Sequence, residues 1–251
     1  MRTLPRIGIV IMAVCCLTNA LLPQSTRNED NINYVLDRYL DAMGGRANLE
    51  KVLSTRLSGT LKYPDGAQYQ ITVLKKRPNL SRIVLDTKTV RFIQAYNGKY
   101  AWFSQESGNK AIYERMSGKM AEDFIRDAPL ENYLVDPYST GVVVALGPDV
   151  QLPGTPCFQI VSTFPDGAKV IHYVDKKEYI ERRIIHLDAA GVQLNEMIPG
   201  KFETIDGVLF AMQMVQMKDG KVVSTLELDQ IETNLGVLDS TFDPPLYIPE
   251  N

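Results

Sequence analysis

Short runs of alternating apolar and polar residues, separated by turn residues, fill most of this chain of 251 residues. Turn sequences of the Pro-Asp-Gly, Asn-Gly and Asp-Gly kinds interrupt the runs at residues 64–66, 97–98, 165–167, 206–207 and 219–220. Such residues end antiparallel strands because they favour the backbone angles of tight turns. Alternation gives each strand one apolar face, so the sequence predicts an antiparallel sheet that curls into a barrel or half-barrel around an apolar interior.

The turns also constrain how the first strands pair. A three-residue loop at residues 64–66 and a turn at residues 77–79 bring apolar residues opposite apolar residues. The expected cross-strand partners are Leu57 with Val73, Gly59 with Ile71, Leu61 with Tyr69, Val73 with Ile83, and Ile71 with Leu85. These strands therefore share one apolar surface.

Three further turns extend this surface. A tight turn at residues 87–88 pairs Leu85 with Val90 and Ile83 with Phe92. A two-residue turn at residues 97–98 places Phe103 opposite Phe92 and directs Trp102 to the other face, whereas a one-residue bulge exchanges the two. A loop at residues 218–220 pairs Phe210 with Leu228 and Met212 with Leu226, with Met214 beside them.

An apolar interior of this kind is either packed solid or left open for a ligand, and the sequence leaves both readings open. If the interior is open, we expect the ligand to be bound by the residues of the shared surface. These are Leu57, Leu61, Tyr69, Ile71, Val73, Ile83, Leu85, Val90, Phe92, Phe103, Phe210, Met212, Met214, Leu226 and Leu228.

Helical periodicity replaces alternation in two places. In residues 31–43 the apolar residues recur three and four positions apart on one side, and Gly44 and Gly45 provide a left-handed stop. Residues 46–53 add a short second helical piece. The other convincing helix covers residues 117–127, with Ser117 as its N-cap.

The segment around residues 117–127 interrupts the series of strands, and its flanks at residues 106–116 and 129–140 resemble loops. A long, partly helical insertion is where a barrel carries a lid. We therefore expect both helices to act as a removable cover. The candidate lid residues are Leu36, Leu40, Met120 and Phe124.

The N-terminus has the pattern of a cleaved secretory signal peptide. Two arginines precede an apolar run at residues 7–17, and residues 18–20 offer a cleavage site after Ala20. We expect a signal peptide over residues 1–20, a flexible leader over 21–30 and a single domain over 31–251. The apolar run is shorter than the roughly 20 residues that span a membrane, although a retained anchor remains an alternative.

Lipid modification of Cys15 or Cys16 is a second alternative. Bacterial lipoproteins resemble one another in a small residue just before the modified cysteine, and here Val14 and Cys15 hold those positions. After cleavage at Ala20 only Cys157 remains, so no disulfide within the chain is expected. Its position at the start of a strand, without an obvious partner, is typical of an inert buried thiol.

Catalytic and metal-binding patterns are scarce in this sequence. The chain has two histidines and no GxSxG, HExxH, phosphate-loop or paired-cysteine motif. We expect His172 to pair with Glu181 across a hairpin and His186 to lie over roughly 10 Å from His172, too far to share a metal. A net charge of −3 without a basic stripe argues against nucleic acid as a partner. No cofactor, metal or enzymatic activity is therefore expected.

Several segments in order resemble the outer-membrane lipoprotein-sorting, or LolA-like, superfamily of carriers. They are the helix, double glycine and first strand at residues 39–61, the hairpin at 75–85, the turn at 94–103, and the segments at 154–167, 202–210 and 238–245. The similarity covers essentially all of the chain that follows the leader. Ala211 departs from the pattern, because relatives often carry proline after the aromatic residue.

The resemblance implies a mainly β fold, with an incomplete antiparallel barrel of about 11 strands wrapped over helices. It also implies a periplasmic carrier for the acyl chains of lipids or lipoproteins, a transport role in outer membrane biogenesis. Membrane proteins of the envelope that load or receive cargo are then possible partners. The alternatives are an envelope sensor or scaffold on the same fold, a hydrolase with an unrecognised acidic pair, and a solidly packed barrel without a ligand.

Overall fold

One antiparallel sheet dominates the computed structural model, which describes residues 31–137 and 141–245. The predicted signal peptide and leader lie outside these residues. The strands are β1 (Ser54–Lys62), β2 (Gln68–Lys76), β3 (Leu80–Asp86), β4 (Arg91–Tyr96), β5 (Ala101–Ser107), β6 (Lys110–Arg115), β7 (Val143–Leu146), β8 (Val150–Leu152), β9 (Thr155–Thr163), β10 (Lys169–Asp175), β11 (Glu181–Leu187), β12 (Gln193–Ile205), β13 (Val208–Lys218) and β14 (Lys221–Thr233).

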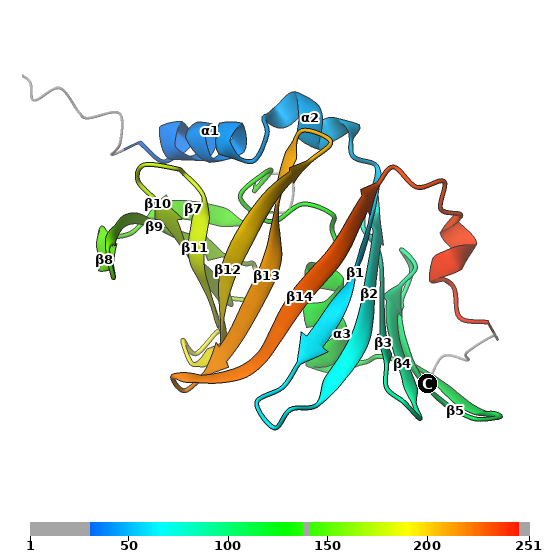
Figure 1. The fold of residues 1–251 in the computed structure, drawn as a ribbon. Coiled ribbons are helices and arrows are strands. Elements are labelled where there is room, and N and C mark those ends of the chain that lie inside the picture. The colour runs from blue at the N-terminus through cyan, green and yellow to red at the C-terminus, as the bar shows by residue number, and fades with distance from the viewer. Residues whose placement is uncertain (1–30, 138–140, 246–251) are drawn as a thin grey trace, which may run out of the picture.

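The strands follow the order β6-β5-β4-β3-β2-β1-β14-β13-β12-β11-β10-β9-β7, and β8 pairs with β9. The two halves of the chain meet at the centre of the sheet, where β1 pairs with β14. The sheet is open, because its edge strands β6 and β7 do not pair with each other, and it curves around α3 (Figure 1). The incomplete barrel predicted from the sequence is confirmed, with 14 strands in the described residues rather than about 11. One of the additional strands, β6, lies where we expected a loop before the second lid helix.

The predicted register holds in the first three strands. Val73 lies opposite both Leu57 and Ile83, and Ile71 lies opposite both Gly59 and Leu85. Gly59 is required at this point, because a Cβ atom there would lie 2.1 Å from the carbonyl oxygen of Glu227 in β14. The apolar surface over these strands is therefore as the alternation predicted.

At three later hairpins the predicted partners are wrong by two residues. Phe92 pairs with Leu85, and Phe103 pairs with Gln94. The hydroxyl of Thr87 accepts a hydrogen bond from the amide of Val90 at 2.8 Å. The tight turn therefore forms one residue later than predicted, and Val90 is its last residue. The Asn97 side chain accepts hydrogen bonds in the next turn in the same way.

In the third of these hairpins Met214, rather than Met212, lies opposite Leu226, because the turn holds two residues instead of three and β14 contains a bulge. A shift of two residues keeps every side chain on its predicted face. The apolar surface is consequently preserved in all three hairpins, and Trp102 points to the opposite face from Phe103.

The three α-helices of the described residues match the predicted segments. They are α1 (Ile32–Ala42), α2 (Arg46–Lys51) and α3 (Gly118–Arg126). The side chain of Asn31 caps α1 by accepting the amide of Asn33 at 2.9 Å, whereas Ser117 occupies the N-cap of α3 without a side-chain cap bond. None of the helices in residues 31–137 and 141–245 is both long and apolar enough to cross a membrane.

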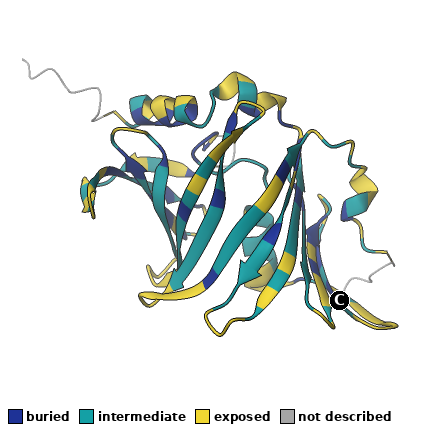
Figure 2. Ribbon diagram, in the orientation of Figure 1, coloured by how far each residue is buried: buried dark blue, intermediate teal, exposed yellow. Residues whose placement is uncertain are grey.

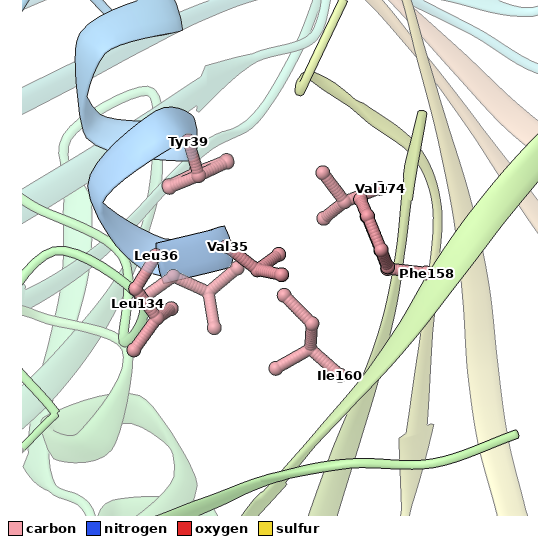
Figure 3. Packing of buried hydrophobic residues seen from close by; sticks show 7 residues of the cluster. All are labelled: Val35, Leu36, Tyr39, Leu134, Phe158, Ile160 and Val174. Atoms are coloured by element: carbon pink, nitrogen blue, oxygen red, sulfur yellow. The ribbon is translucent and has the colours of Figure 1, made fainter. Parts of the chain in front are cut away.

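Both predicted lid helices lie on the concave face of the sheet. The apolar side of α1 packs over β9 and β10 (Figure 3), in a cluster of Val35, Leu36, Tyr39, Leu134, Phe158, Ile160 and Val174. At the other end of the sheet, α3 places Phe124 and Ile125 against Tyr96 and Ala101. Segment 127–135, which follows α3, runs between these two contacts.

The convex face has its own cover near β2 to β5. The C-terminal segment contains the 3-10 helix η3 (Asp239–Phe242), whose Phe242 is fully buried against Leu74 and Leu80. Trp102 donates its indole N–H to the carbonyl of Phe242 at 2.9 Å. This explains why Trp102 is fully buried although it points away from the concave face.

The corner between α1 and α2 is fixed to the hairpin of β12 and β13. The amide of Leu209 donates to the carbonyl of Met43 at 3.0 Å. Gly44 has a φ of +114°, and a Cβ atom on it would lie 2.0 Å from the carbonyl oxygen of Gly207. The double glycine therefore stops α1 and also allows its end to approach the sheet.

We expect Gly44→Ala to lower the free energy of unfolding by about 3 kcal/mol, because strain at a positive φ is combined with a backbone clash. Gly220→Ala is the matched control, since Gly220 has a φ of +72° and open space around its Cβ position. It should cost about 1 kcal/mol, from strain alone. Urea unfolding measures both variants, and equal losses would show that the corner does not need the close contact.

Candidate functional site

Two neighbouring cavities lie beneath the helical cover. The larger, of about 790 Å³, opens between α2, α3, segment 129–136 and the turn after β9. The smaller, of about 260 Å³, lies between α1, α2, segment 130–135 and the strands β1, β2 and β13. The two cavities share wall residues, namely Leu49, Glu131, Asn132 and Val135. Segment 130–135 therefore forms a wall of both.

The concave face beyond the cavities is incompletely covered. Of the fifteen residues predicted to bind a ligand, only Met212 is buried; Phe92 is 40% exposed, and the other thirteen are partly buried. Figure 2 shows this intermediate exposure over much of β1, β2, β13 and β14. In a solid core such side chains would be almost fully buried. The central part of the sheet thus presents an apolar surface that residues 31–137 and 141–245 do not fill.

The structure separates the predicted ligand-binding residues into two groups. Leu57, Val73 and Phe210 line the smaller cavity. The other twelve line neither cavity: Leu61, Tyr69, Ile71, Ile83, Leu85, Val90, Phe92, Phe103, Met212, Met214, Leu226 and Leu228. The predicted lid residues also differ, because Leu36 and Leu40 are buried and Phe124 is partly buried, whereas Met120 is 49% exposed.

Polar residues that we did not predict hold segment 127–135 in place. Lys75, on the concave side of β2, donates hydrogen bonds to the carbonyls of Asp127 and Pro129 at 2.7 and 2.8 Å. Arg77 forms an ion pair with Glu131 and donates to the carbonyls of Val52 and Leu49. Burial lowers the pKa of the Lys75 ammonium to about 8. The sequence signal for Lys75 was its position two residues after Val73, which places it on the apolar face.

A buried polar network lies beside the smaller cavity and joins α1 to the sheet. His172 Nδ1 lies 2.6 Å from one carboxylate oxygen of Glu181, so the predicted pair of these two residues is confirmed. The other oxygen accepts from Tyr39 at 3.3 Å and from Asn132 at 3.2 Å. Burial, and then the Glu181 carboxylate, keep the pKa of Tyr39 well above its ordinary value, so Tyr39 is a neutral donor.

The same network contains a Ser-His-Glu arrangement, because Ser162 Oγ lies 3.3 Å from His172 Nε2. This order of contacts is that of a nucleophilic hydrolase triad. Ser162, however, is fully buried and lines neither cavity. A substrate could not reach its hydroxyl, so we interpret the arrangement as a structural support for α1.

The remaining candidates for chemistry are isolated. Cys157 is buried, and desolvation raises the pKa of its thiol, as expected for an inert cysteine. His172 pairs with Ile184 and His186 with Val170, so the two histidines are diagonal neighbours on one face and the expected separation of over 10 Å is wrong. Within the part of the chain that the structure describes, no group of three or more His, Cys, Asp or Glu could hold a metal ion.

We expect Tyr39→Phe to lower the free energy of unfolding by about 1–3 kcal/mol, because it leaves the buried Glu181 carboxylate with one donor fewer. Tyr96→Phe is the control, since Tyr96 is buried but its hydroxyl bonds to none of the described residues. Its loss should stay below about 0.5 kcal/mol. Equal effects of the two changes in chemical denaturation would show that the network does not stabilise the docking of α1.

The fold itself is found in several solved structures. A DUF1329 family protein from Desulfovibrio piger matches with a TM-score of 0.61 at 13% identity, over 85% of this chain and 98% of its own. A candidate outer membrane lipoprotein-sorting protein domain from Vibrio parahaemolyticus matches with a TM-score of 0.59 at 13% identity, over 85% of this chain and 97% of its own. A LolA superfamily protein from Nitrosomonas europaea matches with a TM-score of 0.55 at 16% identity, over 83% of this chain and 96% of its own.

These similarities establish a LolA-like fold, as the sequence motifs implied. Identities of this size show likeness of fold alone. No protein-family model and no curated protein matches the sequence.

Proposed function

We propose that the protein binds the acyl chain of a lipid or lipoprotein on the concave face of its sheet and carries it across the periplasm. The observation that carries this proposal is the incomplete cover of that face, where only one of fifteen predicted residues is buried and two cavities remain beneath the helices. The likeness to a lipoprotein-sorting domain and to a LolA superfamily protein supports the same class of ligand.

The physical basis of binding is the hydrophobic effect. Each buried CH₂ group contributes roughly 0.8 kcal/mol, so an acyl chain can be held without a catalytic group or a covalent bond. The larger cavity of about 790 Å³ falls within the usual range of ligand sites, and the uncovered apolar surface offers further area for a longer chain. Release then requires movement of the cover or a competing membrane partner.

A carrier of this kind functions outside the cytoplasm, which agrees with the export signal predicted over residues 1–20. We infer a periplasmic location and a cleaved signal peptide with the mature chain beginning near Leu21. N-terminal sequencing of protein recovered from the envelope tests both. An intact Met1 or a lipid-modified cysteine would contradict them.

We expect the wild-type protein to bind a fluorescent fatty acid saturably, and Val73→Trp to abolish this binding by filling the smaller cavity. Because Val73 faces empty space, the variant should unfold within about 1 kcal/mol of wild type. Fluorescence titration measures binding, and thermal unfolding measures stability.

Thr72→Trp is the matched control, because Thr72 is the neighbour of Val73 on the opposite face and is also partly buried. It should bind the probe as the wild type does. If the wild type took up no probe and Val73→Trp lost about 1–3 kcal/mol of stability, the interior would be a packed core and the carrier proposal would be wrong.

A further inference from the structure

We propose that Lys75 and Thr55 form an anion-binding subsite in the smaller cavity, so that the ligand is an amphiphile with a carboxylate or phosphate head. This inference rests on the proposed function and adds the chemistry of the head group to it. The two residues are cross-strand partners in β1 and β2, and both belong to the cavity wall. Side chains of such partners are close enough to bind one oxyanion together.

Lys75 has a hydrogen-bond donor to spare. An ammonium group carries three N–H donors, and Lys75 uses two of them on the carbonyls of Asp127 and Pro129. Among residues 31–137 and 141–245 it has no further acceptor. The third donor is therefore available to a ligand in the cavity.

The hydroxyl of Thr55 is a second hydrogen-bond donor that is available to a ligand. The residue is only 4% exposed and lines the smaller cavity, and its hydroxyl forms no hydrogen bond with the described part of the chain. A hydroxyl at a cavity wall without a protein partner is normally satisfied by a ligand or by water. Its place opposite Lys75 supplies the geometry for a shared acceptor.

Among the described residues, no carboxylate forms a direct ion pair with Lys75. The titratable groups that line the smaller cavity with it are Glu131 and Tyr39. Glu131 is already paired with Arg77, and Tyr39 stays neutral. Asp127 accepts from Lys75 through its backbone carbonyl, and its carboxylate, like that of Glu131, acts on the ammonium only electrostatically, which partly offsets the lowering of its pKa by burial. An incoming anion would add the direct ion pair that neither carboxylate makes.

A purely structural role for Lys75, in holding segment 127–135, does not explain why the residue is charged. Holding segment 127–135 accounts for two of its donors, but the neutral amide of a glutamine could fill part of that role without placing a charge in a largely apolar cavity. Lys76, the next residue, holds the C-terminal segment on the convex face with two bonds of 2.6 Å, to Val237 and Asp239. Lys76 points away from both cavities and is therefore a natural control.

The experiment compares dansyl-undecanoic acid with its methyl ester, which has the same chain and no charge. We expect the wild type to bind the acid at least about tenfold more tightly at pH 7, as a charge-assisted contact implies. Lys75→Met should remove this preference, and Lys76→Met should keep it. Thr55→Val, which preserves shape, should reduce it several-fold and serves if Lys75→Met fails to fold.

The pH profile gives an independent readout. The free ammonium has a pKa of about 8, and a bound anion would raise this value. The affinity for the acid should therefore fall as the pH rises above 8, by up to about tenfold per unit, whereas the affinity for the ester should stay constant. In Lys75→Met the affinity for the acid should lose this dependence.

The outcomes separate the two proposals. Equal binding of acid and ester by the wild type, or an acid preference that survives in Lys75→Met, would overturn the subsite and leave the acyl carrier intact. Binding of neither probe would overturn the proposed function itself. The matching alkyl phosphate should bind like the acid, and displacement of the acid by inorganic phosphate alone would show a site for free anions instead of an amphiphile.

Discussion

The concave face of the sheet has more apolar surface than the described part of the chain covers, and the rest of the structure is arranged around this mismatch. The curved sheet of the described residues, with its apolar face turned inward, creates the surface. The cover consists of α1 at one end, α3 at the other and segment 127–135 between them. Helices of 11 and 9 residues cannot span such a sheet. Cavities and partly exposed side chains are the direct consequence, and they carry the functional proposal.

Two parts of the cover, α1 and segment 127–135, are held by different forces. α1 buries Val35, Leu36 and Tyr39 in an apolar cluster and adds the hydrogen bond from Tyr39 to Glu181. Segment 127–135, in contrast, depends largely on the polar contacts of Lys75 and Arg77. Polar contacts of partly exposed groups exchange with water at a small cost in free energy, whereas an apolar cluster does not. The middle of the cover is accordingly the part that can move most easily when a ligand enters.

The buried network of Ser162, His172 and Glu181 shows why geometry and access must be judged together. Its distances resemble those of a hydrolase triad, but its three residues line neither of the two described cavities. Only their hydrogen-bond partners Tyr39 and Asn132 line the smaller one. Its position under α1 gives it a clear structural role. The carrier reading therefore needs no catalytic group, and Lys75 in the wall of the smaller cavity is suited to binding an anionic head.

The alternation of the sequence determined which residues face the interior, and its periodic segments determined the three helices. This succeeded even where the predicted partners were wrong, because a shift of two residues leaves Phe92, Phe103 and Met214 on the same face. The register itself depended on side-chain contacts within turns, such as those of Thr87 and Asn97, which alternation does not encode. Tertiary structure alone decided that the interior remains partly open and that Lys75 lies opposite Thr55 beside Glu131. Those facts depend on how far short helices reach across a curved sheet, and the spacing of residues along the chain does not contain that information.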